Sequence, residues 1–414
     1  MVLQPVRGTR DILPEENRRF RFIADKARKV ASTYGYAEIA TPIFESTDVY
    51  KRTLGEVSDV VTKEMYTFID RNESSLTLRP EGTAGIARAV VSGGLLQHLP
   101  LRYYYEGPMF RHERPQKGRH RQFHQIGVEL LGAPEPQADV EVIALGAHII
   151  EALGVQSNIT LELNSLGDLE SRSEYRRALV GYLESFRSEL SEESQVRLSS
   201  NPLRILDSKS EKDQQLVSGG PIFSDYLNEK SEHFIKTVCN GLDSLGIKYE
   251  LNPRLVRGFD YYCHTAFEFK SQSLGSQDAV IAGGRYDGLL ELMGSKPVPG
   301  VGWAGGIERL ALLIDSPPSD SRTIAMIPLG EAAEKVALRL TSRLRHLGLT
   351  VDYAFSGNLR RRMKRADKVQ AVVAVIIGDD ELLKKKATLR DLETGKQQEV
   401  FLDDLVTILK KHVA

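Results

Sequence analysis

Basic side chains able to bind a polyanion are concentrated in one stretch of the chain, residues 102–132. Its central segment, residues 111–121, contains one acid, Glu113, and five permanent cations: Arg111, Arg114, Lys117, Arg119 and Arg121. Like charges at this density repel one another, so the segment either stays in water or meets a phosphate-rich ligand. Charge alone leaves both interpretations open.

The residues that follow this basic segment offer three different binding groups in register. Alternation along a strand at residues 122–131 would place Phe123, Gln125 and Glu129 on one face and Ile126 and Val128 on the other. An aromatic ring, an amide and a carboxylate fixed on rigid backbone are unusual for a solvated surface. We therefore favour a site for a polyanion with a small polar molecule beside it.

Two further arginines stand where phosphate binding would explain them. Arg309 follows the glycine pair 305–306 in the first turn of a predicted helix, where a cation opposes the helix dipole and glycine lets a ligand approach the backbone. A salt bridge to Glu308 is the structural alternative. Arg257 lies in an apolar stretch that we expect to be a strand, where an unpaired guanidinium is costly until an anion arrives.

The common nucleotide and zinc motifs are missing. The sequence has no G-x-x-x-x-G-K-[ST], no G-x-G-x-x-G after a predicted strand and no H-E-x-x-H. If a nucleotide binds, arginines must hold its phosphates, and Arg111, Arg257 and Arg309 are the candidates. The two cysteines, Cys239 and Cys263, show neither a disulfide framework nor a C-x-x-C spacing, so zinc is not expected.

The elements around these residues indicate an α/β chain with an α+β core. Residues 103–111 and 122–131, rich in aromatic and β-branched residues, flank a loop with Pro115 and Gly118, which is typical of a β-hairpin. Other helices are expected at residues 14–34, 84–91, 139–153 and 307–314, strands at 36–41, 75–79, 160–163, 254–262, 266–270 and 301–306, and a turn at 282–288. Glu81, just before the second of these helices, could serve only that helix's dipole.

The residue composition and the predicted elements change at two places along the chain. Residues 165–252 are charged and helical, which indicates an inserted helical subdomain, and a proline-containing linker follows at 315–320. From residue 323 to 414 strands alternate with helices, as in a small α/β domain on a largely parallel sheet. This last part has 17 Lys and Arg against 12 Asp and Glu, which weakly favours a nucleic-acid partner. Its basic piece, residues 358–365, fits either a solvated helix face or a phosphate contact.

Length and hydropathy set broad limits. A chain of 414 residues usually forms two or three domains, and 41% hydrophobic with 27% charged residues is ordinary for a soluble globular protein. The N-terminus lacks the apolar run of a signal peptide, and the longest apolar run, residues 371–377, is too short to span a bilayer. We expect a cytoplasmic protein with no membrane partner.

Taken together, the motifs resemble those of bacterial histidyl-tRNA synthetases, a family of class II aminoacyl-tRNA synthetases. The general class signatures are the strand ending at Pro42, FRHERPQKGRHRQFHQ at residues 110–125 and GWAGGIERL at residues 302–310. The histidine-specific signatures are LVRGFDYY at 255–262 and AGGRYDGL at 282–289, and RPEGT at 79–83 agrees with them. The resemblance covers nearly the whole chain.

This resemblance implies a fold and a reaction. It implies a catalytic domain at residues 1–320 with a six-stranded antiparallel sheet flanked by helices, a helical insertion at about 165–252, and an anticodon-binding α/β domain at 323–414. It also implies a homodimer with Pro42 near the interface. The reaction would join L-histidine to tRNA(His) through histidyl-adenylate, using ATP and Mg²⁺ and releasing pyrophosphate and AMP.

The resemblance also implies a role for each candidate residue. Arg111 and Arg257 would be catalytic and grip the α-phosphate, while Arg309 and Arg119 hold the outer phosphates. Phe123 would stack on adenine with Glu113 near the adenine amino group, and Mg²⁺ would bridge the β- and γ-phosphate oxygens without an assigned protein ligand. Histidine would be held at its ammonium by Glu81 and Thr83, near its carboxylate by Gln125, and at its imidazole by Glu129, Tyr262 and Tyr286.

Two alternatives come from other functional classes. The regulatory subunit of ATP phosphoribosyltransferase resembles this catalytic core, but it usually lacks the C-terminal domain and has lost the phosphate-binding arginines, whereas both are present here. A purely tRNA-binding or signalling module would not need Arg111, Arg257 and Arg309 together. ATP–pyrophosphate exchange that depends on histidine distinguishes both from a synthetase.

Overall fold

The computed structural model describes residues 3–55, 58, 60–116, 118–259, 261–275, 278–315 and 322–413. The chain divides into two compact units, Met1–Pro317 and Pro318–Ala414, and each is described by itself. Lys117 of the basic loop and residues 316–320 of the predicted linker lie outside the described residues. Within the described ranges, no helix is both long enough and apolar enough to cross a bilayer.

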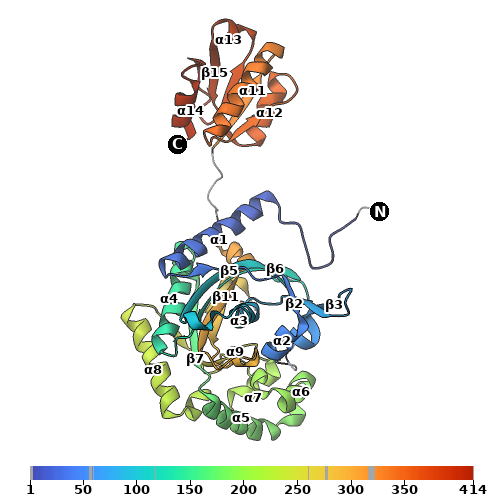
Figure 1. Ribbon diagram of the computed structural model, residues 1–414, viewed down its shortest axis with the longest axis vertical. Coiled ribbons are helices and arrows are strands. Elements are labelled where there is room, and N and C mark those ends of the chain that lie inside the picture. Colours follow the sequence, from blue (N-terminus) through green and yellow to red (C-terminus); the bar gives the residue numbers. More distant parts are fainter. Residues whose placement is uncertain are drawn as a thin grey trace. The chain divides into compact units, whose positions relative to one another are not determined.

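The first unit is built on an eight-stranded sheet of order β1-β5-β6-β11-β10-β9-β7-β8 (Figure 1). Its six inner strands pair antiparallel: β5 Leu101–Phe110, β6 Gln122–Leu131, β11 Gly300–Gly306, β10 Ala279–Arg285, β9 Cys263–Lys270 and β7 Thr160–Ser165. Short strands β1 (Ala37–Glu38) and β8 (Glu250–Leu251) add parallel pairs at the two edges. The predicted hairpin is confirmed as β5 and β6, and the predicted antiparallel core is confirmed with them.

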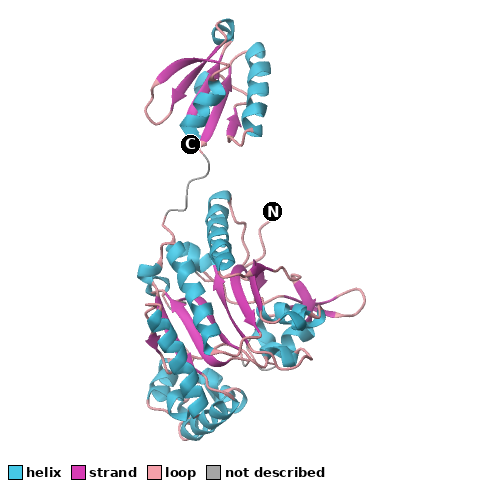
Figure 2. Cartoon of the chain, turned by 60° about the vertical axis from the view of Figure 1, so that its left-hand side comes forward, coloured by secondary structure: helices cyan, strands magenta, loops and turns pink. Residues whose placement is uncertain are grey.

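One face of this sheet is covered by helices. The covering helices are α1 (Pro14–Thr33), α4 (Pro136–Ala152), α8 (Glu229–Ser244) and α10 (Ile307–Leu313) (Figure 2). From β6, the side chains of Ile126, Val128 and Leu130 enter this core, together with Trp303 from β11. This confirms the predicted alternation, because the opposite face of β6 is left for Phe123, Gln125 and Glu129.

A small three-stranded sheet stands beside the large one. Its strands are β2 (Phe44–Ser46), β4 (Ser75–Leu78) and β3 (Tyr66–Ile69), and α2 (Thr47–Leu54), α3 (Thr83–Ser92) and α9 (Leu289–Leu292) lie nearby. Large apolar side chains are exposed there and in the segment leading to β2: Ile43, Phe44, Phe68 and Ile69. Pro42, at the end of the predicted first strand, is exposed as well.

The predicted helical segment contains α5 (Leu169–Glu184), α6 (Glu192–Ser200), α7 (Glu211–Ser218) and α8, with a 3₁₀ turn, η5, at Pro202–Ile205. Buried Tyr175, Leu179, Leu198 and Phe223 form its interior and continue the second core of the unit. One continuous hydrophobic core therefore joins the helical segment to the part of the unit that carries α3 and Tyr262.

The second unit is a five-stranded sheet of order β13-β12-β14-β15-β16. Strands β12 (Thr323–Pro328), β13 (Val351–Tyr353) and β14 (Ala371–Ile377) pair parallel, and β15 (Lys386–Asp391) and β16 (Gln397–Phe401) add antiparallel pairs. Its helices are α11 (Glu331–His346), α12 (Leu359–Lys368), α13 (Asp379–Leu383) and α14 (Leu405–Val413). In the basic helix α12, Arg362 is buried and donates to the carbonyl of Gly357, while Arg360 and Arg361 are exposed.

Two predicted elements were wrong. Described residues 254–259 and 261–262, expected as a strand, form an irregular loop, in which Val256, Tyr261 and Tyr262 pack into the second core of the unit instead of forming a pleated face. Residues 282–285, expected as the start of a turn, lie in β10. Gly283 and Gly284 are needed there since a Cβ would crowd Trp303 at one and Tyr262 at the other.

Candidate active site

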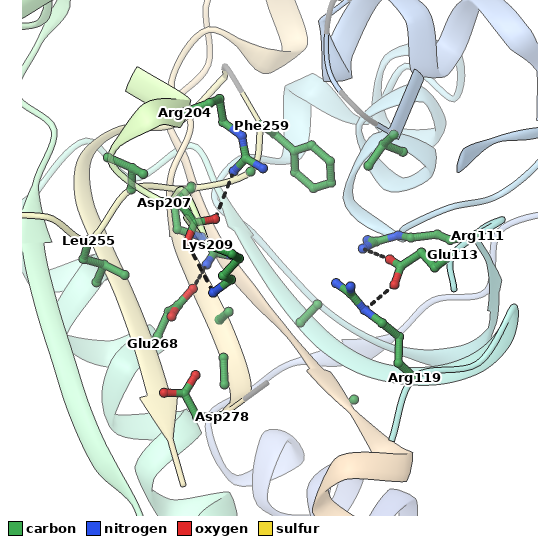
Figure 3. A pocket seen from close by; sticks show the side chains of 18 of the residues that line it. Arg111, Glu113, Arg119, Arg204, Asp207, Lys209, Leu255, Phe259, Glu268 and Asp278 are labelled. Atoms are coloured by element: carbon green, nitrogen blue, oxygen red, sulfur yellow. Dashed lines mark hydrogen bonds and ion pairs between the residues drawn. The ribbon is translucent and has the colours of Figure 1, made fainter. Parts of the chain in front are cut away.

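A cavity of about 1130 Å³ opens in the first unit between the exposed end of the β5–β6 hairpin and the helical segment (Figure 3). Ten of the twelve candidate residues line it together: Glu81, Thr83, Arg111, Glu113, Arg119, Phe123, Gln125, Arg257, Tyr262 and Arg309. Glu129 and Tyr286 lie behind its wall. Residues more than 200 positions apart in the chain therefore meet at one place.

The hairpin supplies one side of the cavity. Arg111 donates from Nε to the carbonyl of Pro80 over 2.9 Å, and its guanidinium lies 5.4 Å from the centre of the Phe123 ring. The buried carboxylate of Glu113 forms an ion pair with Arg119 and lies 3.8 Å from Arg111 Nη1. Glu113 thus orients two arginines toward the same space, as Figure 3 shows.

Arg309 reaches the cavity from the start of α10. Its Nη1 donates to the carbonyl of Ala279 over 2.7 Å, which ties the side chain to β10. Burial lowers the pKa of Arg309, and nearby Arg119 lowers it further, so cationic repulsion is already present in the site. Glu308, the salt-bridge partner considered for Arg309, accepts hydrogen bonds from the backbone of His124.

Arg257 differs from its expected surroundings. It lies in the irregular loop, and its guanidinium forms an ion pair with Glu268 of β9, whose other oxygen is 3.5 Å from Lys270 Nζ. Burial is the largest influence on the pKa of Arg257 and lowers it, but Glu268, Tyr262 and Tyr261 together outweigh burial, so the pKa is raised. The expectation of an unpaired cation is therefore wrong, since a carboxylate 11 residues further along the chain neutralises it.

Glu81 has a structural task as well as a place in the cavity. Its carboxylate accepts hydrogen bonds from the backbone N–H groups of Thr83 and Ala84, at 2.7 and 2.8 Å, and so caps α3. Burial raises the pKa of Glu81. Nearby, Oε1 of Gln125 is buried without a hydrogen-bond partner among the described residues. A ligand with donor groups would satisfy it.

Glu129 forms the centre of a buried polar cluster. It is 1% exposed, and its carboxylate accepts from the hydroxyl of Thr83 at 2.7 Å and from the hydroxyl of Tyr286. Burial raises the pKa of Glu129 to about 8, although both hydroxyls act in the opposite direction. Gly302 on the neighbouring strand makes room for this carboxylate, because a Cβ there would overlap Glu129 Oε2.

Several cavity residues were missed by the sequence reasoning. Tyr261 and Phe259 line the cavity from the irregular loop, and their rings stack at 5.4 Å. Arg204 and Lys209 line it from the helical segment, and Figure 3 shows them opposite Arg111 and Arg119. Tyr261 had a signal, since it adjoins Tyr262, but nothing in the charged helical texture singled out Arg204 or Lys209.

The described residues contain no group of three or more His, Cys, Asp or Glu side chains placed to hold a metal ion. Two cavity carboxylates, Glu268 and Asp278, nevertheless face the same space, as Figure 3 shows. Oxygen ligands of this kind suit Mg²⁺, which usually keeps several waters and takes one or two carboxylates together with substrate phosphates. The carboxylates of the cavity therefore suit a Mg²⁺ ion that binds together with the substrate phosphates.

The six-stranded antiparallel sheet, with arginines from its hairpin and from the helix after β11 meeting in one cavity, defines the catalytic domain of a class II aminoacyl-tRNA synthetase. Two family profiles match the chain, "Histidyl-tRNA synthetase" over residues 8–310 and "Anticodon binding domain" over residues 323–412. The chain belongs to the histidyl-tRNA synthetase family.

Individual relatives agree with this assignment. The chain is 56% identical over 410 residues to the histidine–tRNA ligase of Rhodospirillum rubrum, covering 99% of each protein. The crystal structure of apo Staphylococcus aureus histidyl-tRNA synthetase matches with a TM-score of 0.82 at 37% identity, covering 99% of this chain and 100% of that one. A Bacillus halodurans protein, described as an ATP phosphoribosyltransferase regulatory subunit/histidyl-tRNA synthetase, shares the fold at 24% identity with a TM-score of 0.68, covering 91% and 99%.

Proposed function

We propose that this protein ligates L-histidine to tRNA(His) in two steps at the described cavity. In the first step, the histidine carboxylate attacks the α-phosphorus of ATP, the bond to the β-phosphate oxygen breaks, and pyrophosphate leaves. In the second step, a ribose hydroxyl at the 3′ end of the tRNA attacks the carbonyl carbon of histidyl-adenylate, and AMP leaves. The net product is histidyl-tRNA.

The observation that carries this proposal is the meeting of four arginines, Arg111, Arg119, Arg257 and Arg309, beside a buried polar pocket in one cavity. A carboxylate is already ionised at neutral pH, so the first step needs no general base. Catalysis then consists of holding two anions together and neutralising the charge of the phosphates. Arginine suits this task because its planar guanidinium can bind two phosphate oxygens at once.

Each cation has a part in this scheme. Arg111 and Arg257 hold the α-phosphate, while Arg119 and Arg309 hold the outer phosphates. Phe123 stacks on adenine, and Glu113 accepts from the adenine amino group. The ion pairs of Glu113 with Arg119 and of Glu268 with Arg257 support this scheme, since both hold a guanidinium at the wall of the cavity.

Histidine occupies the adjoining polar pocket in this scheme. Its ammonium contacts Glu81 and Thr83, Gln125 serves the carboxylate region, and the imidazole is recognised by Glu129, Tyr262 and Tyr286. The unpartnered Oε1 of Gln125 supports a polar ligand there. Glu129 does not line the cavity, so it acts on the imidazole either directly after a small rearrangement of the wall or through the hydroxyls of Thr83 and Tyr286.

Three further parts of the proposal follow from membership of the family. Glu268 and Asp278 are the carboxylates that would hold Mg²⁺, which when bound would neutralise charge on the ATP phosphates. The protein acts as a homodimer, which is supported by the exposed apolar side chains of Ile43 and Phe44, which follow Pro42, and of Phe68 and Ile69 on the same small sheet. A cytoplasmic location is part of the same proposal.

The second unit provides the contact with the anticodon. Its match to an anticodon-binding profile supports this role, and the exposed cations on α12, such as Arg360, Arg361 and Lys364, offer charge for a phosphate backbone. Residues 323–414 are accordingly the tRNA-reading domain, and residues 1–320 are the catalytic domain with its helical insertion at about 165–252.

The test is ATP–pyrophosphate exchange by the full-length protein with each amino acid supplied separately. Exchange that requires histidine, followed by charging of tRNA(His), is the expected result. A regulatory subunit of ATP phosphoribosyltransferase would show no exchange and would instead change the activity of that enzyme when mixed with it. Binding of tRNA without exchange would point to an RNA-binding module.

A further inference from the structure

The helical segment contains a buried carboxylate that the catalytic scheme does not use. Asp213, in the first turn of α7, is fully buried. Its Oδ2 accepts hydrogen bonds from the hydroxyls of Ser191, Ser194 and Ser208, each at 2.6 Å, and its Oδ1 accepts from the backbone N–H of Ser191 at 2.8 Å. In the part of the chain that the structure describes, no ion pair reaches this carboxylate.

Hydrogen bonds from three hydroxyls and one backbone N–H keep Asp213 ionised. Burial raises the pKa of a carboxyl group, but the hydrogen bonds from the three serines outweigh it and lower the pKa of Asp213 to about 2. A carboxylate that accepts several short hydrogen bonds is held in one orientation. The group therefore remains a charged, fixed acceptor throughout the neutral pH range.

The three serines come from two segments. Ser191 caps α6 and Ser194 lies in its first turn, whereas Ser208 lies in the loop between η5 and α7. Asp213 thus joins the start of α6, the loop after η5 and the start of α7 at one point. Ser208 is the residue through which the loop is fastened, and Gln214 also donates to its carbonyl at 3.1 Å.

The same short stretch forms one wall of the active-site cavity. Of the residues in α5 to α8 and their connections, those that line the cavity all lie between Ser191 and Gln214. Figure 3 shows Arg204, Asp207 and Lys209 facing the cavity from this wall, opposite Arg111 and Arg119. Asp207 lies between the two cations, 3.6 Å from Arg204 Nη1 and 3.9 Å from Lys209 Nζ.

The position of these cations indicates which substrate meets them. The side chain of Lys209 is 69% exposed, so its ammonium stands at the solvent-facing rim of the cavity. The phosphates of ATP are proposed to lie against Arg111, Arg119, Arg257 and Arg309, and none of these four residues belongs to this wall. The remaining polyanion that must enter past the rim is the 3′ end of the tRNA, and its phosphates attract a lysine there.

We propose that Asp213 is a positioning residue for the transfer of histidine to tRNA: through Ser208 it fixes the loop that presents Lys209 to the phosphates of the acceptor end. This inference rests on the proposed function, because it requires tRNA as the second substrate. It adds a buried residue that touches no substrate and acts through the wall it holds.

The experiment compares two serine variants of the full-length protein, because replacing Asp213 itself could unfold the segment. Ser208→Ala and Ser194→Ala each remove one 2.6 Å hydrogen bond to the same carboxylate oxygen, but only Ser208 holds the loop of Lys209. We expect Ser208→Ala to raise the KM for a tRNA(His) transcript about tenfold, the size expected when one hydrogen bond to a charged group is lost. Ser194→Ala, whose helix start is still held by Ser191, should leave this KM within about twofold.

A double variant distinguishes positioning from general destabilisation. If Ser208 acts through Lys209, Ser208→Ala should add little to the KM for tRNA when Lys209 is already alanine. Equal effects of the two serine variants, a Ser208→Ala defect that persists in full without Lys209, or a rise in the KM for ATP instead of tRNA would each overturn the inference. Absence of histidine-dependent exchange in the unaltered protein would instead overturn the proposed function, so the two failures are distinct.

Discussion

The hydroxyl of Thr83 donates to the carboxylate of Glu129 across 2.7 Å, although 46 positions separate the two residues in the chain. Thr83 begins α3 and lines the cavity, while Glu129 lies behind the wall on β6. This bond connects the end of the cavity where the ammonium of histidine is proposed to bind with the group proposed to recognise its imidazole. Loss of either partner should therefore affect histidine more than ATP.

Replacing Glu129 by alanine should weaken the use of histidine by roughly 10²-fold or more, because a site built to hydrogen-bond a polar ring loses its partner. The KM for ATP in pyrophosphate exchange should change by no more than a few fold, since the phosphate-binding arginines are untouched. Glu129→Gln, which keeps the volume, serves as the matched variant. An equal loss of ATP affinity would remove Glu129 from the imidazole site.

Gly302 offers a test that removes none of the side chains proposed to contact histidine. A Cβ at this position would overlap Glu129 Oε2 and crowd the carbonyl of Val128, so Gly302→Ala should displace the carboxylate and raise the KM for histidine. Gly288→Ala is the control, because a Cβ there meets no atom within 4 Å. Similar histidine KM values for the two variants would contradict the crowded position assigned to Glu129.

The buried acid also predicts a pH dependence of stability. The pKa of Glu129 is about 8 in the folded protein against an ordinary 4.5. Between pH 4.5 and pH 8, the folded state therefore keeps a proton on Glu129 that the unfolded state has lost. Its contribution to the free energy of unfolding is complete below about pH 4.5 and is lost as the pH rises through 8. The melting temperature should therefore decrease more between pH 6 and pH 8 for the unaltered protein than for Glu129→Gln. A parallel fall would mean that Glu129 is already ionised at pH 6.

Removal of the second unit separates the two proposed activities. A chain that ends near Ser319 retains every cavity residue, and so it should still form a dimer and carry out histidine-dependent pyrophosphate exchange. It should charge tRNA(His) poorly, because the cations of α12 and the rest of the tRNA-reading domain are gone. Sedimentation and exchange assays check this, and a folded dimer without exchange would contradict the division of labour.

The features that depend on a local residue pattern could be predicted from the sequence. The alternation of Phe123 and Gln125 with Ile126 and Val128 placed two binding groups on the cavity side and two apolar groups in the core, since strand periodicity needs no knowledge of the rest of the fold. The strand expected at residues 301–306, before Arg309, is also present, as β11.

What the sequence did not show depends on contacts between distant segments. Arg257 was expected to be unpaired, because nothing local indicated that the irregular loop would bring it to Glu268 on β9. The loop itself was mistaken for a strand, since its aromatic residues are those that strands favour. Lys209 resembled any solvated lysine of a charged helical region, and only the fold shows that it lines the cavity.

The role of Arg257 in the first step can be tested by Arg257→Ala. Its guanidinium, held by Glu268 at the wall of the cavity, is proposed to face charge that grows on the α-phosphate as pyrophosphate leaves, so it should stabilise the transition state more than the ground state. We expect the adenylation rate to fall by at least about 10²-fold, a loss of roughly 3 kcal/mol, with much smaller changes in the KM values for ATP and histidine.

Glu268 retains Lys270 at 3.5 Å in the Arg257→Ala variant, so its carboxylate keeps a cationic partner and folding should be preserved. Transfer from preformed histidyl-adenylate to tRNA should suffer less, because pyrophosphate has already left. Single-turnover measurements of the two steps decide the matter: unchanged adenylation with a selective defect in transfer would leave the α-phosphate to Arg111 and Mg²⁺ alone.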